Sequence, residues 1–171
     1  TSSWTSIGAT SDTSTAIDIN GRLFAWGNNS IYQVGDGTTI NKSSPVLIST
    51  FTYPSNSTIT TASWNATSAG VSHTMFIKTD GTLWGVGLNS TGELGDVTVT
   101  NRSTPVIINY DSWTAISAGQ FRSMGIKSDG SLWAWGNGAT GQIGDGTTIN
   151  KSSPVQIGTS SWTMATTGGA A

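Results

Sequence analysis

The chain has 171 residues, charged residues make up only 9% of it, and its formal net charge at pH 7 is −2. It contains only 7 Lys and Arg residues and no apolar run near the ~20 residues of a membrane-spanning helix, so we expect neither nucleic-acid binding nor membrane insertion. Cysteine is absent, which excludes disulfides, thiolate metal sites and thiol nucleophiles.

The chain is built from repeats. Ser-Trp recurs at intervals of 60, 49 and 49 residues, a Gly-Asp pair follows the same offsets, and residues 35–46 read identically to residues 144–155, as GDGTTINKSSPV. Repeats of about 50 residues are typical of the blades of a propeller. The repeated positions are the tryptophans Trp4, Trp64, Trp113 and Trp162 and the glycines Gly35, Gly95 and Gly144.

The repeats predict one domain over residues 1–171. The longer first interval places an insertion loop at residues 51–62. Because the chain has neither an initiator Met nor a signal peptide, we expect it to be processed or to be an excerpt from something longer. The expected units are approximately residues 1–50, 60–110 and 111–160, with residues 161–171 starting a further unit or forming a capping strand.

Each unit is predicted to contain four short strands. In the third unit, residues 113–118 (WTAISA) alternate apolar and polar side chains, which is the period of a half-buried strand. Residues 122–127 (RSMGIK) and 131–135 (SLWAW) follow, and a glycine-rich connection leads to residues 153–157, whose proline suits an edge or strand-opening position. No segment has helical periodicity, so the expected fold class is all-β.

A turn joins the second and third strands of each unit. In the third unit this turn is Asp129-Gly130, and Asn20-Gly21 and Asp80-Gly81 occupy the same place in the other two. We expect a two-residue hairpin turn with positive φ at both positions, because Asn, Asp and Gly tolerate that conformation.

One further pattern runs through the units: G-x-L-x-x-W-G-x-N, then G-Q-x-G-x-G, then P. In the third unit it spans residues 130–137, residues 141–146 and Pro154. The pattern resembles the RCC1 repeat of the regulator of chromosome condensation family. The first unit departs from it at Tyr32, where Gly is expected. The second departs at Val86, Leu88 and Val97, in place of Trp, Asn and Gly.

The resemblance implies a β-propeller in which each unit is one four-stranded antiparallel blade. The family usually closes a ring of about seven blades, so three units form an incomplete ring in this chain. Further blades would come from a longer chain, or several copies would assemble. The strict periodicity of the 8 Trp residues favours packing between blades over a platform for stacking sugars. These residues are Trp4, Trp26, Trp64, Trp84, Trp113, Trp133, Trp135 and Trp162.

The sequence argues against catalysis, metal binding and cofactors. The single histidine, His73, supports no Ser-His-Asp arrangement, and the resemblance implies a packing histidine near the central channel. Most acidic residues fall in turns instead of forming the facing pair that a glycosidase needs. The Asp-Gly-Thr stretches at Asp36 and Asp145 have too few oxygen ligands for a calcium loop.

Two regions are candidate contact surfaces. The resemblance implies that Asp12, Thr13, His73, Phe121 and Arg122 lie around one mouth of the channel, which makes them the first. The insertion is the second, because loops on rigid scaffolds often carry recognition. Its aromatic residues are Phe51 and Tyr53.

The sequence therefore predicts a non-enzymatic, rigid binding or structural module of an extracellular, cell-surface or virion protein. Its loops would recognise a protein or a glycan by shape and hydrogen bonds, because the low charge makes electrostatic steering weak. Three alternatives stay open: a self-assembling architectural subunit of a fibre or filament, a GTPase-exchange scaffold like the family's namesake, and an enzyme acting on polysaccharide.

Overall fold

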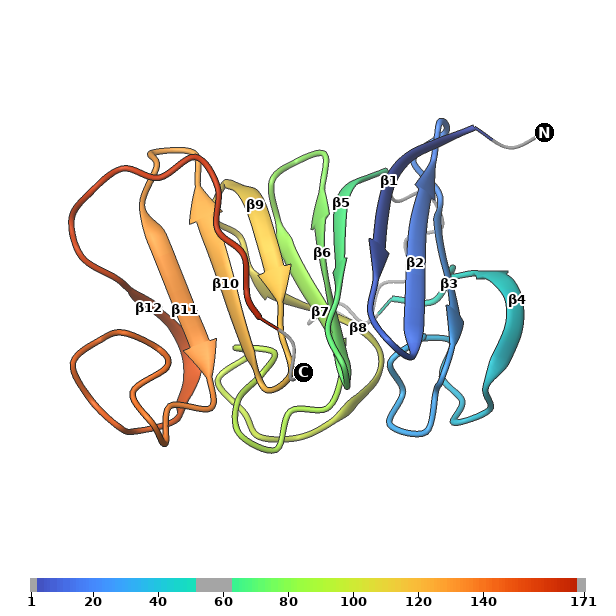
Figure 1. Cartoon of the computed structure of the whole chain (residues 1–171). Coiled ribbons are helices and arrows are strands. Elements are labelled where there is room, and N and C mark those ends of the chain that lie inside the picture. The colour runs from blue at the N-terminus through green and yellow to red at the C-terminus, as the bar shows by residue number, and fades with distance from the viewer. Residues whose placement is uncertain (1–2, 52–62, 169–171) are drawn as a thin grey trace.

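The computed structural model describes residues 3–51 and 63–168, which form twelve β-strands in three four-stranded antiparallel sheets. The all-β prediction is confirmed. Within these two ranges, no helix is long and apolar enough to cross a membrane. The sheets stand side by side in chain order (Figure 1), and we call them blades 1, 2 and 3.

The three blades have the same strand arrangement. Blade 1 consists of β1 (Trp4–Ala9), β2 (Thr13–Asp18), β3 (Leu23–Gly27) and β4 (Lys42–Leu47). Blade 2 consists of β5 (Trp64–Ala69), β6 (His73–Lys78), β7 (Leu83–Gly87) and β8 (Arg102–Asn109). Blade 3 consists of β9 (Trp113–Ala118), β10 (Arg122–Lys127), β11 (Leu132–Gly136) and β12 (Lys151–Gln156).

Strands that follow one another in the chain also pair in each sheet, so β1, β5 and β9 lie at one side and β4, β8 and β12 at the other. β1 contacts β5, and β5 contacts β9, which makes these the inner strands. The outer strands contain Pro45, Pro105 and Pro154. The predicted edge position of the prolines is confirmed, because a residue without an N–H cannot serve a central strand.

The predicted hairpin turn is wrong in type. Among Asn20, Asp80 and Asp129 none has positive φ, and only the following glycine does, as in Gly130 with φ 82°. The Gly130 N–H donates to the Lys127 carbonyl at 2.9 Å, and the Lys127 N–H donates to the Ser131 carbonyl at 3.1 Å. These bonds close a three-residue loop, a type I turn followed by a left-handed glycine, which suits the strand twist equally well.

The core lies between the blades. Ile17, Leu23 and Ala25 on one face of blade 1 pack against Trp64 and Trp84 of blade 2. The other face of blade 2 packs in the same way against blade 3. The central residues of this second core are Ile77 and Leu83 from blade 2 and Trp113 and Trp135 from blade 3. Alternation along each strand produces this arrangement, because successive side chains point to opposite faces of a sheet.

The tryptophans divide by position. Trp64, Trp84, Trp113 and Trp135 are buried, whereas Trp26 and Trp133 are half-buried. Trp4 and Trp162 are 42% and 44% exposed, so their side chains do not pack between two blades in this structure. The physical reason is that, within residues 3–51 and 63–168, no second sheet covers either side chain. The backbone N–H of Trp162 nevertheless donates to the Gly130 carbonyl at 2.9 Å, as the backbone N–H of Trp113 does to the Gly81 carbonyl.

Two departures from the repeat carry backbone strain. Tyr32 and Val97 have φ of 65° and 67°, a region that glycine occupies at the same positions of the other blades. Val97 is also 76% exposed, so its side chain gains little packing within the described chain. A left-handed conformation costs a non-glycine residue about 1–2 kcal/mol, and a β-branched residue adopts it least readily.

We expect Val97→Gly to raise the free energy of unfolding by about 1 kcal/mol, because relief of strain outweighs the added chain entropy of glycine. Urea unfolding followed by circular dichroism measures this difference. The reciprocal control is Gly146→Val in blade 3, at φ 80°, where a Cβ meets no atom within 4 Å. It should destabilise the chain by a similar amount. A destabilised Val97→Gly variant would show that Val97 is not strained.

Candidate functional site

The turns between the first two strands of every blade lie at one edge of the molecule, together with the long loops that precede β4, β8 and β12 (Figure 1). We call this the long-loop edge. A cavity of about 250 Å³ crosses all three blades there. Its lining is small and uncharged, and it includes Ala9, Ser11, Ala69, Val71, Ala118 and Thr167.

The five residues predicted at the channel mouth differ in their exposure to solvent. Asp12 and Phe121 are exposed in turns whose neighbouring residues line the cavity, and Arg122, the first residue of β10, is half-buried. Thr13 and His73 are buried and offer no contact surface. This corrects the prediction for these two residues, because each begins a second strand that the surrounding structure covers. Thr13 donates its hydroxyl to the Asn28 carbonyl at 3.1 Å.

Phe51 is also buried, which corrects its predicted role as a contact residue. Its ring lies 5.3 Å from the Trp64 ring and 6.3 Å from the Trp84 ring, between centroids. Phe51 therefore belongs to the core between blades 1 and 2, because an aromatic side chain beside two tryptophans is more stable out of water. Tyr53 lies outside the described residues.

His73 belongs to a buried polar contact between blades 2 and 3. Its Nε2 lies 2.8 Å from Ser123 Oγ, and the Ser123 hydroxyl donates to the Glu93 carbonyl at 2.8 Å. Because the hydroxyl hydrogen is used in that bond, Nε2 must be the donor to Ser123. Nδ1 then has no hydrogen-bond partner among the described residues. The pair therefore holds two blades together and is not arranged as a general base with a nucleophile.

Burial lowers the pKa of His73 from its ordinary value of 6.5 to about 4. The unfolded chain binds a proton near pH 6.5 and the folded chain does not, so stability is full above pH 6.5 and falls as the pH drops toward 4. The expected loss is about 3 kcal/mol over this window.

Urea unfolding at several pH values measures this loss, and His73→Gln should flatten the dependence, since His73 is the only histidine. The pKa values of Asp36 and Asp145 are lowered to about 2, mainly by hydrogen bonds to Lys42 and Lys151 with Thr38 and Thr147. Burial opposes both shifts, and for Asp36 it is the largest single influence. The contributions of Asp36 and Asp145 to stability are therefore lost at lower pH, as the pH falls from 3.8 toward about 2. An unchanged slope between pH 6.5 and 4 in His73→Gln would contradict the assignment.

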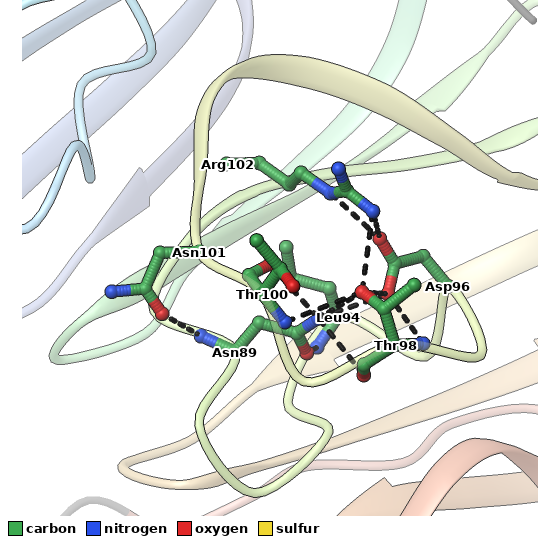
Figure 2. Close-up of polar contacts among 7 residues, drawn as sticks. All are labelled: Asn89, Leu94, Asp96, Thr98, Thr100, Asn101 and Arg102. Carbon is green, nitrogen blue, oxygen red and sulfur yellow. Dashed lines mark hydrogen bonds and ion pairs between the residues drawn. The ribbon is translucent and has the colours of Figure 1, made fainter.

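Each long loop is held by its own polar network, shown for blade 2 in Figure 2. The buried Asn89 accepts a hydrogen bond from the Leu94 N–H at 2.9 Å and donates to Asp96 at 2.9 Å and to the Thr98 carbonyl at 3.1 Å. Arg102 forms an ion pair with Asp96 at 2.5 Å. The carboxylate therefore stabilises the loop itself, as turn-forming acids commonly do.

Sequence reasoning missed Asn89 and its counterpart Asn29, which makes the same contacts in blade 1. Their shared repeat offset was the available signal, but blade 3 has Gly138 there, which hides the pattern. The ion pairs Asp36–Lys42 and Asp145–Lys151 match Asp96–Arg102. Among residues 3–51 and 63–168, no group of three or more His, Asp or Glu side chains is arranged to hold a metal.

The long loops also reach across to the next blade and expose apolar side chains. The Gly37 N–H donates to the Ser103 carbonyl at 2.9 Å, and the Val97 N–H donates to the Ser152 carbonyl at 2.8 Å. These bonds make the edge rigid across blade boundaries. Its exposed large apolar residues are Ile40, Val97, Val99, Phe121 and Ile149.

Four-stranded antiparallel sheets that follow one another and pack face to face through tryptophans define the blades of a β-propeller. The sequence model of the RCC1 repeat, from regulator of chromosome condensation, matches residues 20–77 and 129–170, which is more than half of the chain. A second RCC1 repeat model matches residues 65–93 and 113–142. The chain belongs to the RCC1 repeat family.

Solved structures have the same fold. Human WBSCR16 matches with a TM-score of 0.76 and 17% identity, over 98% of this chain and 43% of that one. Yeast Prp20p from Saccharomyces cerevisiae, described with its binding to Gsp1p and histones, matches with a TM-score of 0.71 and 20% identity, over 90% and 38%. Yeast RCC1 (Prp20) bound to Kap60 matches with 0.72 and 19%, over 90% and 36%. The chain spans less than half of each of these proteins.

Proposed function

We propose that this chain is part of a non-enzymatic scaffold that binds another protein through its long-loop edge. The observation that carries the proposal is that one edge of a rigid frame holds both a cavity of about 250 Å³ lined by all three blades and the exposed apolar side chains of the long loops. An exposed apolar residue gains most when a partner covers it. Yeast Prp20p, which is yeast RCC1, also binds proteins, namely Gsp1p, histones and Kap60.

Val97 adds a second line of support. Its backbone is strained and its side chain is exposed, so the residue costs stability without packing inside the described chain. Strained residues are concentrated at functional surfaces, where a different contact compensates for them. Asp36, Asp96 and Asp145 of the loops are already paired with Lys42, Arg102 and Lys151, and Glu93 is fully buried. The edge is therefore nearly neutral, and binding should depend weakly on salt.

The test is site-specific photo-crosslinking in cells of the source organism, with the photoreactive residue at Ile40, Val97 or Ile149. We expect one common protein adduct from all three positions. The matched control is Tyr110, which is exposed but lies in the connection between β8 and β9, away from the long loops. Adducts of equal yield from Tyr110, or none from the three loop positions, would exclude the long-loop edge as the binding surface.

Extracellular, cell-surface or virion location, assembly into a filament, and action on polysaccharide stay predictions from the sequence. Nucleotide exchange on a small GTPase rests on the fold alone, and fold does not determine function. The release rate of labelled nucleotide from a small GTPase, with and without the chain, measures that activity directly. An unchanged rate would remove the exchange role and leave protein binding untouched.

A further inference from the structure

A second cavity, of about 460 Å³, is lined by the β2–β3 hairpin of blade 1 and the start of blade 2. That hairpin lies at the edge of the molecule opposite the long loops (Figure 1). Its volume falls in the range of small-ligand sites. The side chains around it are mostly hydroxyls and carboxamides. They include Thr5, Ile19, Asn20, Ser63, Asn65 and Thr79.

Asn20 is free to bind a ligand because blade 1 builds its hairpin turn differently. In blades 2 and 3 the turn residues Asp80 and Asp129 accept hydrogen bonds from the N–H and hydroxyl groups two residues later. In blade 1, the Asp18 carboxylate instead accepts the hydrogen bond of the Arg22 N–H, at 2.9 Å. Among the described residues, the Asn20 carboxamide therefore has no hydrogen-bond partner.

Asn65 and Ile19 also distinguish this cavity from the equivalent junction between blades 2 and 3. Asn65 is exposed at the start of β5, where β9 has Thr114. Ile19 is 69% exposed, where blades 2 and 3 have Thr79 and Ser128. The blade 1–2 junction thus combines two carboxamides with one aliphatic side chain.

The cavity is electrically neutral toward a ligand. Asp18, its one acid, is almost fully buried and accepts bonds from two backbone N–H groups and from the Arg22 guanidinium at 2.7 Å. Carboxamides both donate and accept, so each of them can form hydrogen bonds with a hydroxyl of a pyranose ring. An aliphatic side chain beside them suits the C–H face of the same ring. We propose that this cavity binds an uncharged saccharide unit.

The proposal is tested by ¹H–¹⁵N NMR titration of the chain with N-acetylglucosamine, glucose and maltose, with glucuronate as the charged comparison. We expect saturable shifts of the Asn20 and Asn65 side-chain amides with at least one neutral sugar and a Kd on the order of millimolar, since the cavity is shallow. Glucuronate should bind no better. Absence of these shifts with all three neutral sugars would overturn the proposal.

Variants taken from the chain's own repeats keep the fold intact. Asn20→Asp and Asn65→Thr install the residues of the equivalent positions, and each should weaken binding about three- to tenfold. Thr114→Ala at the blade 2–3 junction should leave the affinity unchanged. Equal affinity in the double variant Asn20→Asp/Asn65→Thr would also overturn the proposal. The site lies on the opposite edge from the proposed protein contact, so either can fail independently.

Discussion

Replacing Trp84 with alanine is expected to lower the free energy of unfolding by about 3–5 kcal/mol, near the upper end for a large core residue. Trp84 is fully buried between blades 1 and 2. Its ring centroid lies 5.8 Å from that of Trp64, and Lys78 Nζ lies 4.1 Å from the ring centre. Alanine therefore leaves a cavity and removes a cation–π contact from an almost fully buried lysine.

Urea unfolding monitored by circular dichroism measures this loss. The matched control is Trp4→Ala, in the first strand of blade 1. Trp4 is 42% exposed, and among the described aromatic rings it contacts only that of Phe24. It should cost less than about 1.5 kcal/mol, since little apolar area returns to water. Equal losses in the two variants would show that the junction between blades 1 and 2 is not the main source of stability.

Asn89→Ala is expected to cost about 3–4 kcal/mol, although the residue lies in a loop. The fully buried side chain serves one donor, the Leu94 N–H, and four acceptors: Asp96, the Thr98 hydroxyl, and the carbonyls of Thr98 and Thr100. Removing the carboxamide leaves buried polar groups without partners, and each costs about 1–3 kcal/mol.

Hydrogen exchange at the Leu94 amide, alongside urea unfolding, measures the effect, because that N–H is bound only while the loop holds its shape. Asn101→Ala is the control from the same loop. Asn101 is exposed and accepts one hydrogen bond, from the Asn89 N–H at 2.9 Å, so about 1 kcal/mol is expected. Fast exchange at Leu94 in the wild type would contradict a loop locked by Asn89.

The strands were predictable because their signals are local. Alternation over residues 113–118 and 122–127 matches β9 and β10 at both ends. The hairpin type was not predictable from Asp129-Gly130, because that pair is compatible with two-residue and three-residue loops. The bond from the Lys127 N–H to the Ser131 carbonyl selects the longer one.

The candidate site was less predictable than the fold. Asp12 and Phe121 are exposed as a contact surface requires, but His73 and Thr13 are not. Whether a side chain at the start of a second strand is covered depends on the neighbouring blade, whose position no local pattern contains. For the same reason the sequence predicts a recognition role for Phe51, whereas the structure places its ring beside those of Trp64 and Trp84.

The sequence by itself determined the repeat, the all-β class, the outer position of the prolines and the family, because these follow from spacing and from the two-residue period of a strand. Only the tertiary structure decided which tryptophans are buried, that Asn89 locks a loop and that Asn20 is free. Those properties depend on contacts between residues of different strands and blades, and burial exists only once a second surface is in place.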